Sequence, residues 1–259
     1  MTADGPSFGV VIPARFASTR LPGKPLIDLG GKSMVVRVME LAARSGASFS
    51  IVATDDERIA AAVTDAGGEA IITSNEHETG TDRLAEVARR LHLEPDLILV
   101  NLQGDEPLLE PELIQRVAQT LAAEPEASLA TVATPIRDSA ALHDPNVVKV
   151  VLDQGGRALY FSRAPIPWLR GQLEVASGGH ASAPDDLFLR HVGLYAYRVS
   201  TLLTLSQVRR TALEEAESLE QLRALWLGMK IQVAVIPDLP PGGVDTEEDV
   251  ERVRRILAS

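Results

Sequence analysis

The 259-residue chain contains no cysteine. Disulfides, cysteine zinc sites, iron–sulfur clusters and thiol nucleophiles are therefore excluded together. The chain also has no excess of positive charge, since 25 lysines and arginines stand against 36 aspartates and glutamates, for a net charge of −11. An acidic surface is a poor general landing site for nucleic acid or anionic lipid. A bound polyanion would need a local group of basic residues.

Long apolar runs are missing as well. No stretch approaches the roughly 18 to 20 consecutive apolar residues that a membrane span needs. Residues 1–5 have no basic region of the kind that opens a signal peptide, and the short apolar run after them stops at Pro13, as a strand does. We therefore expect a cytoplasmic protein without membrane insertion. The balance of 45% apolar and 24% charged residues is that of a folded protein and excludes wholesale disorder.

Short apolar runs alternate with amphipathic segments through the first half of the chain. The strands expected here are 8–12, 50–53, 70–72 and 97–100, and the helices are 33–43, 57–65, 82–91 and 112–121. Apolar strands joined by helical crossovers predict an α/β fold with a mostly parallel, Rossmann-like sheet covered by helices on both faces. Ligands of such sheets bind at the carboxyl ends of the strands, which directs attention to the loops at 13–25, 54–56 and 102–107.

The second half of the chain is less regular. A hairpin is expected from 147–152 and 158–161, followed by a strand at 191–198, one helix over 213–227, a strand at 231–236 and a C-terminal helix. The segment 173–186 is rich in Gly, Ser, Ala and Pro and is expected to be a mobile excursion. These elements predict a smaller, mixed β region beside the main sheet.

The loop 13–25, Pro-Ala-Arg-Phe-Ala-Ser-Thr-Arg-Leu-Pro-Gly-Lys-Pro, is the most informative segment. Three bases and no acid lie between Gly5 and Ile27, although the chain is acidic as a whole. Cations and free backbone N–H groups after a strand suit a polyphosphate, whereas the alternative is a solvated basic loop. Neither GxGxxG nor GxxxxGK[ST] occurs in the loop, so the usual dinucleotide and P-loop patterns do not apply.

Two carboxylates are candidate metal ligands. Asp105 follows the buried strand at 97–101, where an oxygen ligand is well placed for Mg²⁺; the alternative is that it caps the next helix. Asp245 stands at the expected start of the C-terminal helix, with Glu248 three residues later to complete a capping box. From the residues alone, capping is the favoured interpretation of Asp245.

Three further groups allow two interpretations each. Residues 79–83 open a helix: either their N–H groups and Arg83 face a base or phosphate, or a threonine caps the helix and Arg83 lies on its surface. His191 and Tyr195 share one face of a strand and contact either a ligand or the backbone. The pair at 220–221 flanks an apolar helical stripe and would otherwise be helix surface.

Several motifs in the same order resemble those of the sugar-acid cytidylyltransferases. They are the 13–25 loop, Asn-Leu-Gln-Gly-Asp-Glu-Pro at 101–107, Lys-Val-Val-Leu-Asp at 149–153, Leu-Tyr-Phe-Ser-Arg at 159–163, Phe-Leu-Arg-His at 188–191, Leu-Glu-Gln-Leu-Arg at 219–223 and Gly-Val-Asp-Thr at 243–246. Within the family, the likeness is greatest to enzymes that use 3-deoxy-D-manno-octulosonate (Kdo). The resemblance implies Mg²⁺-dependent transfer of CMP from CTP to the anomeric 2-hydroxyl of Kdo for lipopolysaccharide biosynthesis, with release of pyrophosphate.

The resemblance also implies roles for individual residues. Catalysis would involve Arg15, Lys24, Asp105 and Asp245, of which the two aspartates would bind Mg²⁺. The nucleotide would be bound by Ala14, Arg15, Lys24, Gly80, Thr81, Arg83 and Gln103. The sugar acid would be bound by Gln103, Arg163, His191, Tyr195, Glu220 and Gln221. A homodimer is expected, without a nucleic-acid partner.

The same likeness divides the chain into a nucleotide-binding core at 1–135, a sugar-binding and dimerisation region at 136–230, and a return to the core at 231–259. Two alternatives stay open: a cytidylyltransferase for another acidic sugar, such as sialic acid or amino-Kdo, and a non-catalytic nucleotide-binding protein. The segments 188–195 and 219–223 favour Kdo. A NAD-dependent dehydrogenase fits the opening order of elements but lacks the glycine fingerprint.

Overall fold

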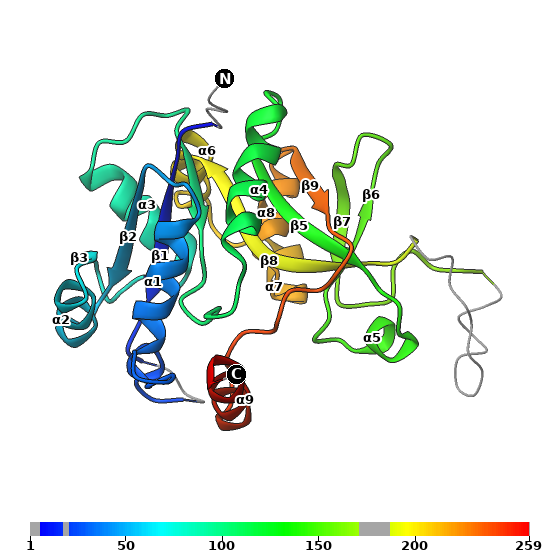
Figure 1. The fold of residues 1–259 in the computed structure, drawn as a ribbon. Coiled ribbons are helices and arrows are strands. Elements are labelled where there is room, and N and C mark those ends of the chain that lie inside the picture. Colours follow the sequence, from blue (N-terminus) through cyan, green and yellow to red (C-terminus); the bar gives the residue numbers. More distant parts are fainter. Residues whose placement is uncertain (1–5, 18–20, 171–186, 259) are drawn as a thin grey trace, which may run out of the picture.

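The computed structural model describes residues 6–17, 21–170 and 187–258. A nine-stranded sheet passes through the molecule, and seven strands follow one another in the order β3-β2-β1-β4-β8-β5-β9 (Figure 1). These strands are β1 (Phe8–Ala14), β2 (Phe49–Thr54), β3 (Glu69–Ile72), β4 (Ile98–Asn101), β5 (Leu129–Pro135), β8 (Leu189–Arg198) and β9 (Ile231–Val235).

The sheet is mixed. β1 pairs in parallel with β2 and β4, β2 with β3, and β5 with β9, whereas β8 lies antiparallel between β4 and β5. The expected hairpin is formed by β6 (Lys149–Leu152) and β7 (Ala158–Ser162), and β6 joins it to β8. The prediction of an α/β fold with a mostly parallel sheet is confirmed. The sequence analysis did not predict β5, which is joined to β4 by the antiparallel strand β8.

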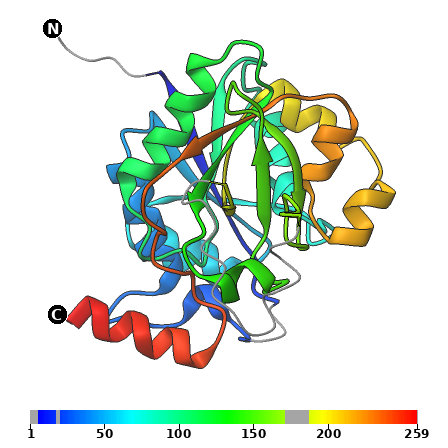
Figure 2. The ribbon, with the colours of Figure 1, turned by 90° about the vertical axis from the view of Figure 1, so that its right-hand side faces the viewer.

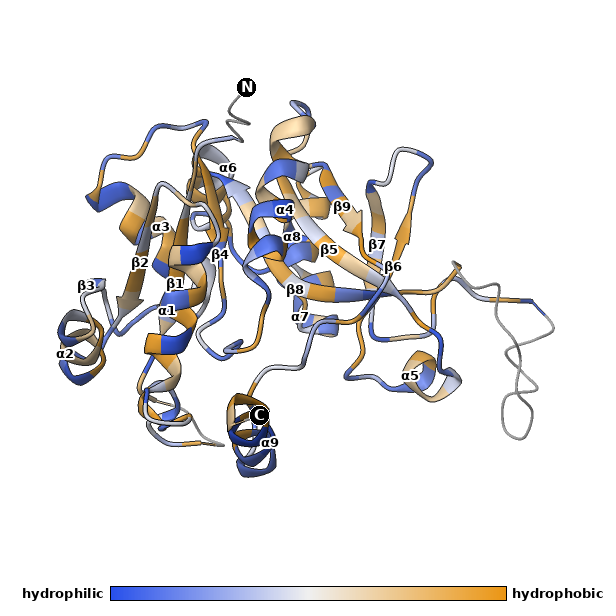
Figure 3. Ribbon diagram, in the orientation of Figure 1, coloured by the Kyte–Doolittle hydropathy of each residue, from blue (hydrophilic) through white to orange (hydrophobic). Residues whose placement is uncertain are grey.

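Helices cover both faces of the sheet (Figure 2). One apolar layer joins the sheet to α1 (Met34–Arg44), α2 (Glu57–Asp65) and α4 (Pro111–Ala123). The opposite layer contains α3 (Gly80–Arg90), α6 (Val199–Leu205) and α8 (Gln221–Trp226). Apolar residues follow the strands, and the polar faces of the helices turn outward (Figure 3). The short α5 (Ser139–His143) packs in a small separate cluster.

The single helix expected over 213–227 is wrong, because the chain forms two helices there, α7 (Ala212–Glu217) and α8. Ser218 between them has a φ of 51°, in the left-handed region that ends a helix. At the same break, the Glu217 carboxylate accepts hydrogen bonds from the Ser162 hydroxyl at 2.5 Å and from the backbone N–H of Arg163 at 2.8 Å. The turn is therefore tied to the end of β7.

The end of the chain returns to the first loop. Val244 and α9 (Glu247–Ala258) pack against Leu21, Leu29 and Met34 in a cluster of their own. The short 3₁₀ helix η1 (Lys24–Leu26) lies within this stretch of the first loop. The expected mobile excursion at 173–186 falls outside the described residues. Across the described ranges, none of the helices has both the length and the apolar character that crossing a membrane would take.

Candidate active site

A cleft of about 350 Å³ opens at the carboxyl ends of β1 and β4. Six residues expected at the site lie on its wall: Ala14, Arg15, Lys24, Gln103, Asp105 and Asp245. They come from the end of β1 and the loop after it, the loop after β4 and the segment before α9. Three distant parts of the sequence therefore meet where a parallel sheet places its ligands.

One ammonium group contacts both candidate metal ligands. Lys24 Nζ donates to Asp105 Oδ2 at 2.6 Å and to Asp245 Oδ1 at 3.1 Å. The Lys24 side chain is only 13% exposed, whereas those of Asp105 and Asp245 are 37% and 49% exposed. Two carboxylates that are far apart in sequence thus point toward the same ammonium group, that of Lys24.

The two aspartate-bearing loops are held together by the backbone. Val244 N–H donates to the Asp105 carbonyl at 2.8 Å. A Cβ atom on Gly243 would lie 2.9 Å from that same carbonyl oxygen and 2.9 Å from Glu106 Oε1. Such distances are below normal contact, so this approach requires glycine. Val244 is fully buried beside α9, which fixes the loop that carries Asp245.

The helix caps are formed by other residues. Thr246 caps α9: its hydroxyl accepts from Asp249 N–H at 3.3 Å, and its own N–H donates to Asp249 Oδ2 at 3.0 Å. The favoured sequence interpretation, a capping box of Asp245 and Glu248, is therefore wrong by one residue. The alternative for Asp105 is also wrong, because the N-cap of α4 is Glu110. The N-caps of α4 and α9 are thus Glu110 and Thr246 rather than the two aspartates.

The residues of the cleft fit Mg²⁺. Within the described ranges, no group of three or more His, Asp or Glu side chains could form an all-protein metal cage. Mg²⁺ is commonly bound by one or two carboxylates, completed by waters and substrate phosphates, which agrees with two converging aspartates. Glu106 lies next in sequence to Asp105 but lines a neighbouring hollow, and burial, followed by the charge of Asp105, raises its pKa to about 7, so it adds less negative charge beside the two aspartates than an ordinary glutamate would.

A second hollow of about 110 Å³ adjoins the first and shares Ala14, Arg15 and Gln103 with it. Its opposite wall is the start of α3, including Gly80 and Arg83. The expected nucleotide residues of both loops therefore face one another. Thr79 caps α3, as one interpretation expected, by accepting from Asp82 N–H at 3.1 Å. Thr81, the second residue of the helix, is buried.

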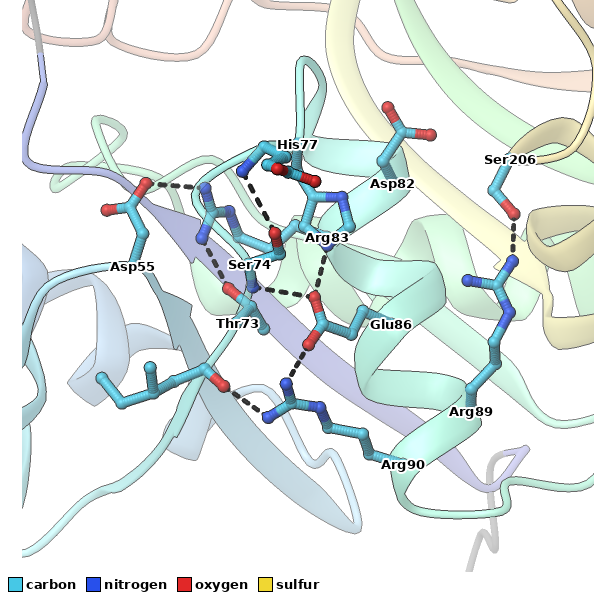
Figure 4. Close-up of polar contacts among 12 residues, drawn as sticks. Asp55, Thr73, Ser74, His77, Asp82, Arg83, Glu86, Arg89, Arg90 and Ser206 are labelled. Atoms are coloured by element: carbon cyan, nitrogen blue, oxygen red, sulfur yellow. Dashed lines mark hydrogen bonds and ion pairs between the residues drawn. The ribbon is translucent and has the colours of Figure 1, made fainter.

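Arg83 is held inside the protein. The side chain donates to Asp55 Oδ2 at 2.9 Å and to the Thr73 hydroxyl at 2.5 Å (Figure 4). Asp55 Oδ1 in turn accepts from Phe16 N–H at 3.4 Å, which ties this pair to the first loop. Sequence reasoning assigned no site role to Asp55, although its place after β2 was a usable signal. The pair links the end of β2, the first loop and the start of α3.

His191 and Tyr195, the residues of β8 expected to bind the sugar, are the next part of the site. His191 Nε2 is 3.0 Å from the Thr131 hydroxyl, and the His191 ring packs edge-on against Phe161 with centroids 5.1 Å apart. His191 also lines a hollow of about 170 Å³ together with Gln103 and Arg190, so this strand and the loop after β4 face a common space.

Three polar atoms near this strand are buried without a hydrogen-bond partner among the described residues: Asn101 Oδ1, Tyr195 Oη and Gln221 Nε2. Asn101 and Tyr195 are paired across β4 and β8. An unsatisfied buried polar atom costs about 1–3 kcal/mol, so several together are typical of a site for a polar ligand. Two of the three were expected to bind the sugar, and Asn101 was not.

Glu220 and Arg163 lie at two edges of this region. Glu220 Oε1 accepts from the Thr79 hydroxyl at 3.5 Å, and burial raises the pKa of Glu220. Arg163 lines none of the cavities above: its Nε donates to the Glu217 carbonyl at 2.7 Å and its Nη1 to the Pro145 carbonyl at 2.8 Å. These bonds fix the guanidinium plane, and no bond to Nη2 forms within the described residues. The structure thus orients Arg163 without bringing it into the metal cleft.

His191 is half-buried at the wall of the hollow, and the desolvation of its ring predicts a pH-dependent stability. Burial lowers the pKa of His191 from 6.5 to about 3, so the folded protein binds fewer protons than the unfolded chain between these values. The neutral ring makes its full contribution to the free energy of unfolding above pH 6.5, and this contribution falls as the pH drops toward 3. From pH 7 to pH 5 this residue should cost about 2 kcal/mol of unfolding free energy.

Urea unfolding of His191→Gln at both pH values measures this effect: the variant should lose about 2 kcal/mol less than the wild type on acidification. The exposed His143 on α5 provides the control. His143→Gln should lose as much unfolding free energy between pH 7 and pH 5 as the wild type does. An equal loss in all three proteins would contradict a buried neutral His191.

Comparisons with known proteins agree with this geometry. Residues 10–231 match the model of a family described as cytidylyltransferase. The chain is 52% identical over 260 residues to the 3-deoxy-manno-octulosonate cytidylyltransferase of Polynucleobacter necessarius subsp. necessarius, covering 100% of this chain and 99% of that one. It is 53% identical over 251 residues to the protein of the same name from Yersinia enterocolitica, with 97% and 98% covered.

Solved structures show the same relationship. CMP:2-keto-3-deoxy-manno-octonic acid synthetase in complex with CTP matches with a TM-score of 0.86 and 42% identity, over 97% of this chain and 99% of that one. A 4-diphosphocytidyl-2C-methyl-D-erythritol synthase from Anaerococcus prevotii matches with a TM-score of 0.60 at 13% identity, which shows a shared fold alone. The family match and the full-length identities agree: this chain belongs to the cytidylyltransferase family.

Proposed function

We propose that the chain transfers CMP from CTP to the anomeric 2-hydroxyl of Kdo, giving CMP-Kdo and pyrophosphate for lipopolysaccharide biosynthesis. The observation that carries the proposal is that Asp105 and Asp245 both accept hydrogen bonds from the Lys24 ammonium group. All three residues lie in the cleft that also contains Arg15 of the basic loop after β1. Full-length relatives named for this reaction support the choice of Kdo. A related structure in complex with CTP supports the choice of nucleotide.

The chain's own side chains perform positioning and charge neutralisation. Asp105 and Asp245 would hold Mg²⁺, which when bound supplies Lewis acidity to the α-phosphate and the attacking hydroxyl. Arg15 and Lys24 would neutralise the charge that develops on the leaving pyrophosphate, an effect that is strong in a preorganised site. The start of α3, which lines the smaller hollow, would direct its N–H groups and the positive end of its dipole toward the nucleotide.

The sugar acid would be bound by side chains from β7, β8 and α8. Arg163 would grip the carboxylate, since its fixed guanidinium suits a planar oxyanion. The buried Tyr195 and Gln221, whose polar atoms have no partner in the described ranges, would bind sugar hydroxyls together with His191 and Glu220. Gln103 would contact both substrates, because it lines all three hollows.

A substrate screen tests the proposed function. Purified protein is mixed with CTP or UTP and with Kdo, amino-Kdo or sialic acid, with and without Mg²⁺, and pyrophosphate release is measured. The proposal predicts the highest kcat/KM for CTP with Kdo, and turnover that is lost in EDTA and restored by Mg²⁺. A higher kcat/KM for another sugar acid would make that sugar, rather than Kdo, the proposed substrate. If no pair of substrates released pyrophosphate, the proposed enzymatic activity would be wrong.

The close contact at Gly243 predicts a sensitive position. Gly243→Ala should lower kcat at least 10-fold, because the new methyl group must push the Asp245 loop away from the Asp105 carbonyl. Pyrophosphate release at saturating substrate measures the effect. The neighbouring Gly242 is the control, since a Cβ there meets only Arg252 at 3.9 Å. Equal activity of Gly243→Ala and Gly242→Ala would mean that the two loops need not touch.

The remaining sequence expectations stay proposals. We propose a cytoplasmic homodimer, with 1–135 as nucleotide-binding core, 136–230 as sugar-binding and dimerisation region, and 231–259 as the segment that returns the second aspartate. Sedimentation equilibrium of the purified protein tests the dimer, and a monomer at micromolar concentration would contradict it.

A further inference from the structure

Lys24 occupies the place where the two metal carboxylates converge. Its Nζ lies 2.6 Å from Asp105 and 3.1 Å from Asp245. At such distances the ammonium group forms a charge-assisted hydrogen bond with each carboxylate, and its single positive charge balances one of their two negative charges. Lys24 is also the least exposed of the three, at 13%. The proposed function, however, assigns Lys24 to the triphosphate and the carboxylates to Mg²⁺.

The backbone around Lys24 is fixed by a turn, so a change of partner would involve movement of the Lys24 side chain alone. Gly23 has a φ of 70°, and its carbonyl accepts from Leu26 N–H at 2.8 Å, which closes the turn of η1. Pro25 is buried directly after Lys24. A lysine side chain has four rotatable bonds and moves readily between nearby anions.

Lys24 and a divalent cation compete for the same carboxylates. Two positive charges close together repel, and the repulsion is strong in a partly buried cleft. Among the described residues that line this cleft, the other base is Arg15, and its side chain is exposed. A triphosphate would supply both new ligands for the metal and new anions for the ammonium group.

On the basis of the proposed function, we infer that Lys24 is the counter-ion of the metal carboxylates in the nucleotide-free protein, and that it transfers to the phosphates when CTP and metal enter together. Lys24 therefore keeps metal affinity low until nucleotide is present. Metal and nucleotide binding become strongly cooperative, and the metal alone is a poor ligand. The free protein avoids a tightly held metal that would fix the aspartates before the substrate arrives.

Binding of Mn²⁺ tests this inference without any turnover. Free Mn²⁺ is quantified by electron paramagnetic resonance during titration of wild type, Lys24→Met and Lys32→Met with MnCl₂ alone. Lys32 pairs with Glu40 on the surface, so its variant controls for the loss of one positive charge. Lys24→Met should bind Mn²⁺ alone at least 10-fold more tightly than the wild type, and Lys32→Met should match the wild type. Affinity in Lys24→Met that equals or falls below that of the wild type overturns the inference.

A second titration uses the wild type only, so it stands even where Lys24→Met fails to fold. Mn²⁺ is titrated with and without α,β-methylene-CTP, a non-hydrolysable analogue. The Mn²⁺ affinity attributable to the protein should rise at least 10-fold with the analogue, after correction for Mn²⁺ bound by the analogue itself. Equal affinity with and without it contradicts the transfer of Lys24.

The outcome separates the inference from the function on which it rests. If the wild type is active but Lys24→Met binds Mn²⁺ with the same affinity as the wild type, the proposed function stands and the counter-ion role of Lys24 is wrong. A wild type that releases no pyrophosphate from CTP with any sugar acid removes the proposed function itself.

Discussion

Asp105→Asn should abolish CMP transfer, with kcat at least 10³-fold below wild type, equivalent to about 4 kcal/mol of transition-state stabilisation. The amide has the shape of the carboxylate and still accepts a hydrogen bond from Lys24, but it lacks the charge that holds Mg²⁺. The loss should therefore fall on turnover while most CTP affinity remains in the basic loop. Pyrophosphate release measures the first quantity and calorimetric titration with CTP the second. Asp105→Ala should lose activity to the same extent.

The exposed Asp96, before β4, is the matched control for this change. Asp96→Asn removes the same charge outside the cleft and should keep wild-type turnover. Circular dichroism melts should show both variants folded. A rate for Asp105→Asn near that of Asp96→Asn would remove Asp105 from the reaction.

Arg163→Ala should raise the KM for Kdo roughly 10- to 100-fold, because hydrogen bonds to a charged group contribute about 1.5–3 kcal/mol each. The KM for CTP should change by less than about two-fold, since Arg163 directly follows β7, and the strands β6, β8 and β4 separate β7 from β1 and the proposed nucleotide-binding loop. Steady-state kinetics with each substrate varied in turn measure both constants. The split between the two is the diagnostic result.

Arg163 also bonds the carbonyls of Glu217 and Pro145, so local loosening must be separated from lost substrate contact. Arg157 on the same hairpin is a suitable control, because it lies in the turn before β7 and pairs with Glu126 on the surface. Arg157→Ala should leave both KM values unchanged. Equal increases for Kdo and CTP in Arg163→Ala would place the sugar pocket elsewhere.

The sequence was most informative where short-range chemistry decides the outcome. Apolar strands followed by polar loops predicted the edge of the sheet at which Lys24 and Asp105 lie. The capping pattern before α9 was also recognised, but it was placed one residue too early. Thr246 and Asp249 form the box, and this leaves Asp245 directed at Lys24. The resemblance, rather than the spacing, predicted that Asp245 is a metal ligand.

Features set by tertiary contacts were not predictable in the same way. The position of β8 between β4 and β5 depends on which strands pair, which no local pattern states. The break at Ser218 depends on Glu217 reaching the end of β7. The burial of Arg83 with Asp55 depends on β2 lying next to α3. Each of these positions a residue of the site through a partner that is distant in sequence.

Anomalous diffraction from a crystal of the protein with Mn²⁺ and α,β-methylene-CTP tests the central claim most directly. The account predicts a manganese peak bonded to carboxylate oxygens of both Asp105 and Asp245 and to the α-phosphate, with the Lys24 ammonium group moved onto the phosphate chain. A manganese ion bound away from these aspartates, or Lys24 still bridging them beside the bound nucleotide, would contradict it.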